Sequence, residues 1–594
     1  MPSPPIEEYG QRLRACELRI AHFDQLHIRL GNTRLLLAIA TLLAAWLSFG
    51  RHLFSPWWLF LPIAAFAGIA SYHSGVLQRR ALAERAASVY RSGLARIEDR
   101  WAGTGQQGER FRDPHHIYAA DLDLFGAGSL FELLSIARTR MGEDTLAQWL
   151  LSPSTVDAIH ERHAAIQELR PQLNLREDLA VLSEDSRAGV HPEALLQWAE
   201  SPNGLPQQWL RWLALLLALL AVATAVLWAA WDVKSPFLAT VAIEGGILFV
   251  FRKQTEEALA GTEREFEDLN LLSTLLARLE RQHFVAARLQ TLSAALSSHH
   301  LEGSRAIARL RNIVQYIESR ENWFLRILNV PLMYSFQAAY AAETWRRDHG
   351  HAVRTWLSAI GEMEALLSLA AFSYEHPENS FPELISGAAS FHAEELGHPL
   401  IPAAKCVRNT VSIVEPARAL IVSGSNMSGK STLLRAVGVN TVLAMAGAPV
   451  RARLLRLTPL HVGASIAIHD SLQEGNSRFY TEITRLRQIY DLAEQPPPLL
   501  FLLDELLQGT NSSDRRIGAE GIVRALMDRG AIGLISTHDL SLTEIDISQD
   551  HRLHNVHFQD EMENGRMKFD FKLREGVVTK SNGLELMRSI GLKV

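Results

Sequence analysis

The sequence has little cysteine and no strong excess of charge of either sign. Its 594 residues include two cysteines, Cys16 and Cys406, too few for a disulfide framework or a thiolate zinc site. This scarcity favours a reducing compartment. The formal net charge is −6, so the chain is not a globally basic nucleic-acid-binding protein, although a local basic patch is compatible with that average.

Metal-site spacing is also lacking, although the chain contains 23 histidines. Three pairs of neighbouring histidines lack a spaced set of further ligands: His115 and His116, His299 and His300, His349 and His351. Ordinary surface or core histidines are the better interpretation. A chain of this length exceeds one hydrophobic core, and about three to five domains are expected.

Long hydrophobic runs are present, and they occur in two pairs. Residues 35–49 and 57–72 form the first pair, and residues 212–231 and 236–251 form the second. A bilayer crossing needs about 17–25 apolar residues, and the runs of the first pair come close to that length only when flanks such as Gly50, Phe54 and Ser55 are included. Each pair predicts a transmembrane helical hairpin, with the run that contains Glu244 as the least certain crossing. A single run is also compatible with a buried helix of a soluble protein. Two pairs with short loops favour the membrane.

Basic residues flank these hairpins on one side. Five arginines precede the first run, namely Arg12, Arg14, Arg19, Arg29 and Arg34. Arg79, Arg80 and Arg85 follow the second run, and Arg252 and Lys253 follow the fourth. Each hairpin loop contains a single basic residue, Arg51 in the first and Lys234 in the second. By the positive-inside rule both tips point outward and the large segments stay in the cytoplasm. The sequence therefore predicts a multi-pass membrane protein whose C-terminal region is cytoplasmic.

Residues 419–434 combine an apolar strand, a glycine-rich turn and a helix start. The turn has the spacing G-x-x-x-x-G-K-S, in which glycines let backbone N–H groups surround a phosphate beside a helix N-terminus. Lys430 is predicted to reach the β- and γ-phosphates, and Ser431 to hold Mg²⁺. A glycine-rich surface turn is the disfavoured alternative. The predicted nucleotide-binding residues are Gly424, Ser425, Asn426, Met427, Ser428, Gly429, Lys430, Ser431 and Thr432.

Two later strand ends supply further polar groups. The apolar run 499–503 ends in Asp504 and Glu505, as expected for a buried strand that delivers carboxylates to a sheet edge. Asp504 is predicted to bind Mg²⁺, and Glu505 to polarise the attacking water. The run 531–536 precedes Thr537 and His538, and His538 is predicted to position the γ-phosphate. The alternative for the acids is a solvated pair at a strand end.

Together these motifs resemble the ATPase domain of the MutS DNA mismatch-repair family. The family patterns G-x-N-M-x-G-K-S-T, D-E-x-x-x-G-T and T-H are matched at 424–432, 504–510 and 537–538, and G-x-S-x-F is matched at Gly475, Ser477 and Phe479. The resemblance implies ATP and Mg²⁺ as cofactors and hydrolysis with Lys430, Glu505 and His538 as catalytic residues. It also implies a homodimer in which Ser477 reaches the partner's nucleotide, and DNA as a partner.

The resemblance extends more weakly upstream, and it has gaps. The segments that start at Met141 and Ile159 resemble the family's helical core. Residues 1–114 stand in place of the family's mismatch-reading domain, so mismatch recognition is not implied. Cys406 occupies the position where the family often places an aromatic residue against adenine.

The predicted fold is multi-domain, with a helical core and lever region, membrane hairpins and a C-terminal α/β P-loop ATPase domain with a mainly parallel sheet. The predicted regions are an N-terminal helix (1–34), a transmembrane hairpin (35–72), a core-like helical region (73–208), a second hairpin (209–253), a lever-like helical region (254–385) and the ATPase domain (386–594). We expect a mismatch-repair-like ATPase that couples dimer closure to DNA or partner binding at a membrane. The alternative is a motor or nucleotide switch of a membrane assembly without DNA binding.

Overall fold

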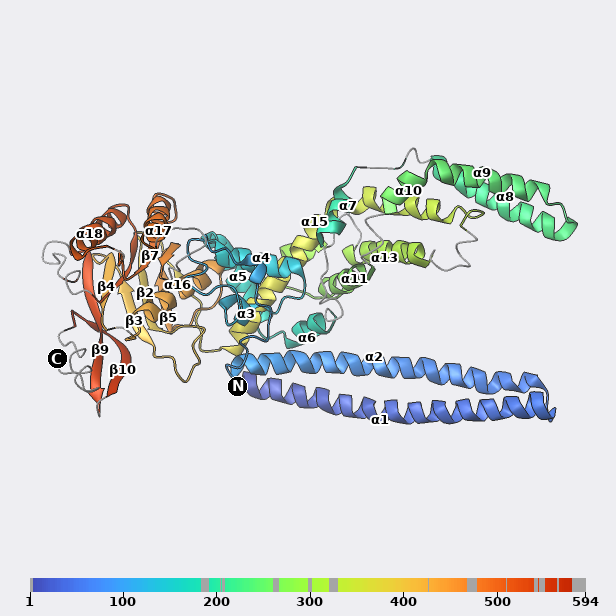
Figure 1. The fold of residues 1–594 in the computed structure, drawn as a ribbon, viewed down its shortest axis with the longest axis horizontal. Coiled ribbons are helices and arrows are strands. Elements are labelled where there is room, and N and C mark those ends of the chain that lie inside the picture. Colours follow the sequence, from blue (N-terminus) through green and yellow to red (C-terminus); the bar gives the residue numbers. More distant parts are fainter. Residues whose placement is uncertain are drawn as a thin grey trace. The chain divides into compact units, whose positions relative to one another are not determined.

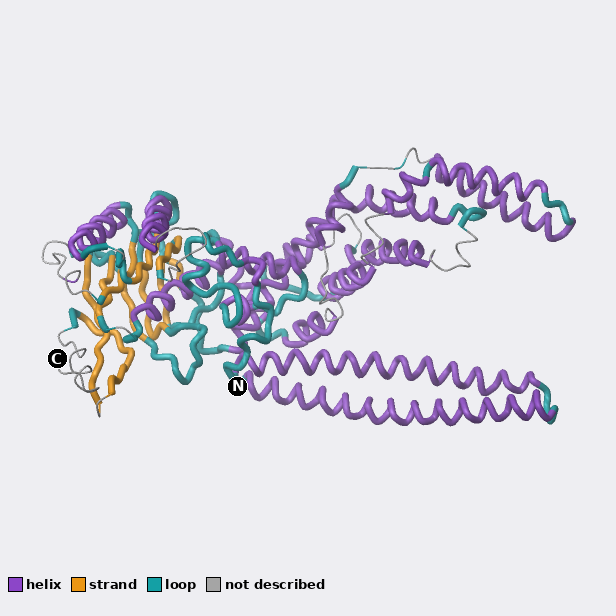
Figure 2. Tube along the Cα trace, viewed as in Figure 1, coloured by secondary structure: helices purple, strands orange, loops and turns teal. Residues whose placement is uncertain are grey.

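A computed structural model gives the architecture of the chain (Figure 1). It describes all residues except 1–3, 183–191, 203–204, 206–208, 260–265, 297–301, 320–328, 426, 467–477, 509, 539–542, 544–550, 564–565 and 579–594. The chain divides into two compact units, one formed by Met1–Trp101 with Gln172–Asp185 and the other by Ala102–Pro171 with Ser186–Val594. Figure 2 shows that strands occur only in part of the second unit, whereas the first is helical.

The first unit is a long antiparallel hairpin of α1 (Pro5–Ala45) and α2 (Phe60–Ile97), with α6 (Leu173–Leu182) against it. Two short turns, Trp46–Gly50 and Pro56–Leu59, close its tip. Ion pairs tie the polar half together, with 2.5 Å between Arg80 Nε and Asp24 Oδ1 and 3.2 Å between Arg91 and Glu17. Helix α1 runs without a break through the predicted region boundary at residue 34, and Gly31 close to that boundary is accommodated within the helix.

Large apolar side chains cover the distal half of this hairpin. Leu42 is 71% exposed, Trp57 86% and Phe60 73%. Three described helices are long and apolar enough to cross a membrane, namely Pro5–Gly50, Pro56–Ile97 and Trp209–Trp231. The helix that contains Glu244 has 16 residues, about 24 Å at 1.5 Å per residue, which is shorter than a hydrocarbon core of about 30 Å.

One 42-residue helix, α15 (Tyr334–Glu375), organises the helical part of the second unit. At 1.5 Å per residue it is about 63 Å long. Helices pack along its length: α3 (Leu130–Leu134), α4 (Arg140–Leu151), α5 (Val156–Leu169), α7 (Pro192–Glu200), α10 (Arg252–Leu259), α12 (Ala287–Leu296) and α13 (Gly303–Ser319), which also contacts α11 (Phe266–Glu280). Its buried face is rich in alanine and leucine, which suit close helix packing.

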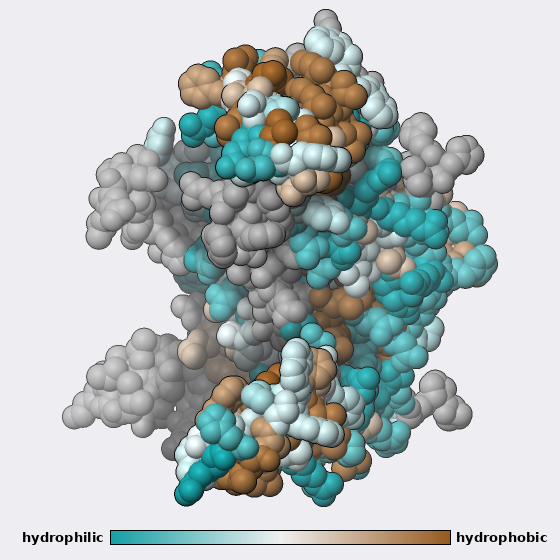
Figure 3. Space-filling view, turned by 90° about the vertical axis from the view of Figure 1, so that its right-hand side faces the viewer, coloured by the Kyte–Doolittle hydropathy of each residue, from teal (hydrophilic) through white to brown (hydrophobic). Residues whose placement is uncertain are grey.

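The second hairpin consists of α8 (Trp209–Trp231) and α9 (Ser235–Val250). Its base packs into an apolar cluster with the start of α15, where Met333, Phe336 and Tyr340 are buried. The rest of α8 exposes leucine and tryptophan, with Leu219 61% exposed. Figure 3 shows hydrophobic residues gathered on the surface of the hairpins.

The C-terminal domain holds two sheets. The smaller has the order β1 (Glu383–Leu384), β5 (Leu454–Leu457), β2 (Phe391–Leu396) and β3 (Asn409–Ile413). The larger has the order β10 (Arg566–Glu575), β9 (Leu553–Glu563), β4 (Ala419–Ser423), β8 (Ile532–Thr537), β7 (Leu499–Asp504) and β6 (His461–Ser465). All pairs of the larger sheet are parallel except β10 with β9. The predicted α/β domain with a mainly parallel sheet is confirmed.

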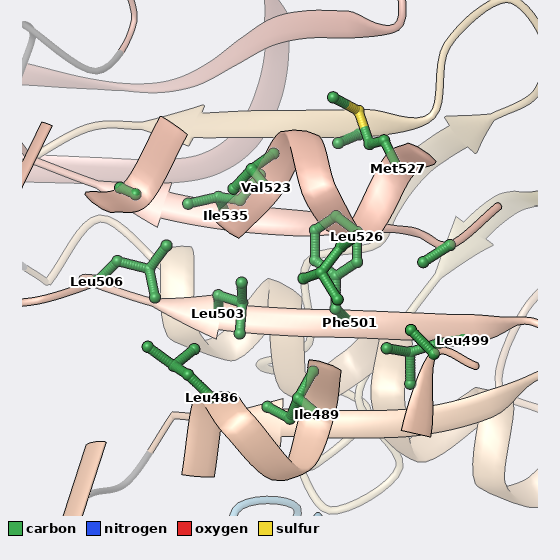
Figure 4. Packing of buried hydrophobic residues seen from close by; sticks show 14 of the residues in the cluster. Leu486, Ile489, Leu499, Phe501, Leu503, Leu506, Val523, Leu526, Met527 and Ile535 are labelled. Atoms are coloured by element: carbon green, nitrogen blue, oxygen red, sulfur yellow. The ribbon is translucent and has the colours of Figure 1, made fainter. Parts of the chain in front are cut away.

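Helices cover the larger sheet and complete its core. They are α16 (Lys430–Ala446), α17 (Arg478–Leu492) and α18 (Ser512–Asp528). Phe501 and Leu503 of β7 are fully buried against Ile489 of α17 and Leu526 of α18 (Figure 4). Full burial of each such side chain contributes about 1.5–3 kcal/mol. This packing fixes the strand ends at which the predicted site residues lie.

Candidate nucleotide site

The predicted phosphate loop connects β4 to α16. Gly429 adopts φ 104°, a conformation that favours glycine, and α16 begins at the next residue. The side-chain oxygens of Ser425 and Ser428 are buried, and neither has a hydrogen-bond partner within the described part of the chain. Unsatisfied buried donors of this kind fit an anionic ligand. Asn426 lies outside the described residues, and Met427 is 85% exposed.

Lys430 is folded back onto this loop. Its side chain is 5% exposed, and Nζ donates hydrogen bonds of 2.9 Å to the carbonyl oxygens of Gly424 and Ser425. Burial lowers the pKa of Lys430, while the nearby carboxylates of Glu505 and Asp504 oppose that shift. The ammonium group is therefore held at the mouth of the loop, where it can exchange carbonyl contacts for phosphate oxygens.

The acidic pair lies at the adjacent strand end. Asp504 pairs with Ser536 in the β7–β8 register, and its carboxylate accepts a hydrogen bond from the Ser536 hydroxyl. Glu505 begins the turn after β7 with φ 51°, and its N–H donates to the carbonyl oxygen of Ser536 at 3.2 Å. Parallel strands β4, β7 and β8 thus bring the phosphate loop and both acids to one edge of the sheet.

The Glu505 carboxylate meets three polar neighbours. Its Oε1 is 3.1 Å from His538 Nδ1 and 4.0 Å from Lys430 Nζ, and its Oε2 accepts a hydrogen bond from the Gln508 amide. The structure therefore brings the three predicted catalytic residues together. Gln508 was not among the predicted site residues, because no motif distinguished it from the variable positions around it.

Some predicted residues are less fully placed. Ser431 and Thr432 are exposed in the first turn of α16. Ser477, predicted to act on a partner's nucleotide, lies outside the described residues, as does Gly475. Phe479 of the same motif lies in the first turn of α17 and packs against the domain core.

A cavity of about 220 Å³ adjoins the phosphate loop. Cys406 lines it, together with His398 and two aromatic residues, Phe558 and Phe571. Burial lowers the pKa of His398 to about 4, with the positive charges of Arg435 and Arg451 as further causes. This histidine is therefore neutral near pH 7 and adds no charge to the pocket, whose lining also includes Lys405 and Asn409.

Phe571 presents an aromatic ring to the cavity that Cys406 also lines. Its backbone has φ 53°, and Asn409 holds it from both sides: Nδ2 donates to the Phe571 carbonyl at 3.0 Å, and Oδ1 accepts from Leu573 N–H at 2.9 Å. A Cβ atom on Gly429 would lie 3.2 Å from Phe571 Cδ1, so the ring closely approaches the loop. Local sequence gave no signal for this residue, because its position depends on how β10 folds back.

These features define a class of protein. A phosphate loop between a parallel strand and a helix, with two carboxylates at a neighbouring strand end, is the arrangement of a P-loop ATPase. The family model for MutS domain V matches residues 420–593, and that for MutS domain III matches residues 117–370. The chain is a MutS family protein with domains III and V, and domain V is its ATPase.

Several curated relatives are similar to parts of the chain. The "DNA mismatch repair protein MutS 2" of Halobacterium salinarum is 31% identical over 39% of this chain and 27% of its own length. The "Endonuclease MutS2" of Thermus thermophilus is 35% identical over 33% of this chain and 25% of its own length. The "DNA mismatch repair protein MutS" of Exiguobacterium sp. is 25% identical over 79% of this chain and 60% of its own length.

The chain thus spans between 25% and 60% of the length of these relatives. The predicted family and the predicted ATPase are confirmed at the level of domains III and V. Membrane anchoring gains no support from these proteins and stays a prediction. The match to domain V begins at residue 420, after the first strands of the C-terminal domain.

Proposed function

We propose that the chain hydrolyses ATP with Mg²⁺ as a homodimer, and that it does so at the cytoplasmic face of a membrane. The observation that carries the proposal is the position of the Glu505 carboxylate, 4.0 Å from Lys430 Nζ and 3.1 Å from His538 Nδ1 at the sheet edge beside the phosphate loop. A carboxylate held there is suited to accept a proton from a water that attacks the γ-phosphate.

The other roles follow from the same geometry. The loop N–H groups and Lys430 bind the phosphates. His538 is held by its contact with Glu505 and orients the γ-phosphate. The Ser431 hydroxyl and the Asp504 carboxylate are hard oxygen donors of the kind that Mg²⁺ prefers. The ion would neutralise phosphate charge when bound. Adenine binds in the adjoining cavity against Phe571. Phe571 takes the role of the aromatic residue that the family often has at the position of Cys406.

Two features support the homodimer. Apolar side chains are exposed around the site, with Met427 85%, Tyr480 60% and Ile517 68% exposed, and apolar patches of this kind mark interfaces. The motif with Ser477 directly precedes α17. Each variant alone lacks one of the two groups at both of its sites, whereas a mixed dimer of Lys430→Ala and Ser477→Ala subunits keeps one site with both groups. Mixing should therefore give more ATP hydrolysis than the two separate preparations together, up to about half of the wild-type sites. Strictly additive activities would contradict the shared site.

The partner is proposed to be DNA, because the relatives that carry these domains are named as DNA mismatch repair proteins. A second candidate is an ATPase motor or switch of a membrane assembly, which the packing of the α8–α9 hairpin against α15 favours. Binding to duplex, mismatched and branched DNA at several salt concentrations separates the two. A steep decrease with salt supports DNA, and negligible binding at every concentration supports the second candidate.

Substitution of the site residues tests the hydrolysis itself. Lys430→Ala should abolish ATP binding, whereas Glu505→Gln should bind ATP and hydrolyse it about 10²- to 10⁴-fold more slowly, because only proton transfer is lost. Glu520→Gln, a charge-matched change at the ion pair with Arg524 on α18, should leave turnover unchanged. Normal turnover in Glu505→Gln would overturn the assignment of the base.

A further inference from the structure

The turn that carries Glu505 has an unusual backbone. Two of its non-glycine residues are left-handed, Glu505 with φ 51° and Leu507 with φ 56°. Such conformations cost about 1–3 kcal/mol each and persist only where surrounding contacts impose them. The first N–H of the turn donates to the carbonyl oxygen of Ser536 on β8. Arg515 of α18 donates to the carbonyl oxygens of Leu507 and Gln508, so contacts with neighbouring elements hold the turn that carries the Glu505 carboxylate.

Glu482 of α17 provides a further contact. Its Oε1 accepts a hydrogen bond of 2.6 Å from the backbone N–H of Leu507, and the glutamate is 3% exposed. A buried carboxylate is costly unless it is hydrogen-bonded, and a bond from N–H to a charged oxygen is about twice as strong as a neutral one. Apolar packing around the turn, where Leu506 and Leu507 are buried, does not require an acid there.

The helix that carries Glu482 is itself firmly held. Arg485 follows Glu482 by three residues on α17. It donates hydrogen bonds to the carbonyl oxygens of Pro114, His115 and His116, and the bond to His116 is 2.7 Å long. Ile489 is fully buried in the domain core. A shift of α17 would therefore reach the turn through Glu482, and α17 begins directly after the segment that contains Ser477.

We propose that Glu482 is a positioning residue for hydrolysis: it fixes the turn at Leu507 and so aims the Glu505 carboxylate at the attacking water. The contact also joins this aim to α17, the helix next to the predicted trans-acting motif. The inference rests on the proposed function, because it assigns Glu482 a role in the reaction for which Glu505 is the base.

Length and charge of the side chain separate positioning from a general structural role. Glu482→Gln keeps an oxygen at the same reach without charge, whereas Glu482→Asp keeps the charge but is one methylene too short for Leu507 N–H. Positioning predicts that the Gln variant retains most of the kcat and that the Asp variant loses it about 10- to 100-fold, since a misplacement of about 1 Å has that effect. The KM for ATP should change by less than about twofold in both.

The full chain in detergent is used, with Asp491→Asn as the control, because Asp491 lies on the same helix and its ion pair with Arg487 is exposed. ATP binding is measured on every variant by equilibrium titration. A kcat for Glu482→Asp equal to or above that of Glu482→Gln would overturn the inference. If the wild-type protein hydrolyses ATP no faster than Glu505→Gln, the proposed function fails. That result does not depend on the role of Glu482, so the two failures are distinguishable.

Discussion

At the scale of single residues, an exposed aromatic ring, that of Phe571, lines the cavity beside the phosphate loop. Phe571 is 41% exposed, and its backbone is held by Asn409. A neighbouring ring, Phe569, stacks on it with centroids 5.9 Å apart. An aromatic face that is fixed before the ligand arrives binds a base without further ordering, which favours affinity.

Replacement of Phe571 by alanine should therefore weaken ATP binding more than turnover. Loss of base stacking costs about 1–3 kcal/mol, which corresponds to a roughly 5- to 150-fold increase in the Kd for ATP. Phe571→Tyr should keep the affinity. The kcat at saturating ATP should stay within about twofold, because the ring contacts the base and not the reacting atoms. Titration with a fluorescent ATP analogue and steady-state hydrolysis measure the two quantities.

Phe569→Ala is the matched control, since this ring supports Phe571 but does not line the cavity. Its effect on Kd should be smaller than that of Phe571→Ala. Equal losses in both variants would mean that the stacked pair supports the β10 strand and that neither ring holds the base.

At the scale of helices, α15 is joined to α4 by a buried carboxylate. Glu364 accepts hydrogen bonds from the backbone N–H groups of Arg138 and Thr139 at 3.2 Å each, and from the Thr139 hydroxyl at 2.5 Å. Thr139 is the N-cap of α4. Glu364 thus accepts hydrogen bonds from the start of α4, and these bonds lower its pKa. Burial has the larger effect and raises the pKa of Glu364 to about 7.

This shift makes the stability of the joint depend on pH. An acid whose pKa rises from 4.5 to about 7 on folding binds more protons when folded, so its contribution is full below pH 4.5 and is lost as pH rises through 7. Glu364→Gln should thus gain stability relative to wild type by up to roughly 3 kcal/mol between pH 5 and 8. Thermal unfolding of both proteins across that range measures this difference.

The comparison with wild type matters because half-buried His163 and buried His398, whose pKa values are lowered to about 4, change stability with pH in the opposite direction. Ser368→Ala is the control: it removes hydrogen bonds with Ile136 N–H and the Glu364 carbonyl but no titrating group. A constant difference between Glu364→Gln and wild type from pH 5 to 8 would show that Glu364 does not titrate in this window.

Elements of the site were predictable where the chemistry is local in sequence. The phosphate loop lies within nine residues, and the acids directly follow one apolar strand, so spacing alone predicts both. Phe571 and Glu482 were missed, because the first reaches the loop through strand pairing 142 positions after Gly429 and the second meets Leu507 through helix packing. Helix α1 runs through the predicted region boundary at residue 34, because the change there is in hydropathy and not in helix propensity.

At the scale of the whole molecule, packed helices connect the ATPase domain of the second unit to its hairpin, and α15 is the longest of them. Within the described chain α15 contacts α4, which packs on the phosphate-loop helix α16, and at its other end it contacts α8. A nucleotide-dependent change at α16 has a continuous path of packed helices toward the hairpin base. The orientation of the α8–α9 hairpin in a membrane therefore determines on which side of the membrane that path ends.

Cysteine labelling of intact cells measures this orientation. In a Cys16→Ser and Cys406→Ser background, Leu53→Cys and Val233→Cys place thiols at the two hairpin tips, where the native side chains are 69% and 43% exposed. The positive-inside rule predicts that both react with a membrane-impermeant maleimide from outside. Ile517→Cys on α18, where the native side chain is 68% exposed, should react only after permeabilisation.

The labelling pattern separates three arrangements, because each exposes a different set of thiols. Reaction of Leu53→Cys alone would mean that α8 and α9 do not both cross, as the 16-residue length of α9 allows. Protection of both tips in intact cells, with release of the protein by alkaline carbonate, would mean that the apolar faces are covered by protein and that the membrane assignment is wrong. Reaction of both tips with protection of Ile517→Cys places the ATPase domain beside cytoplasmic ATP.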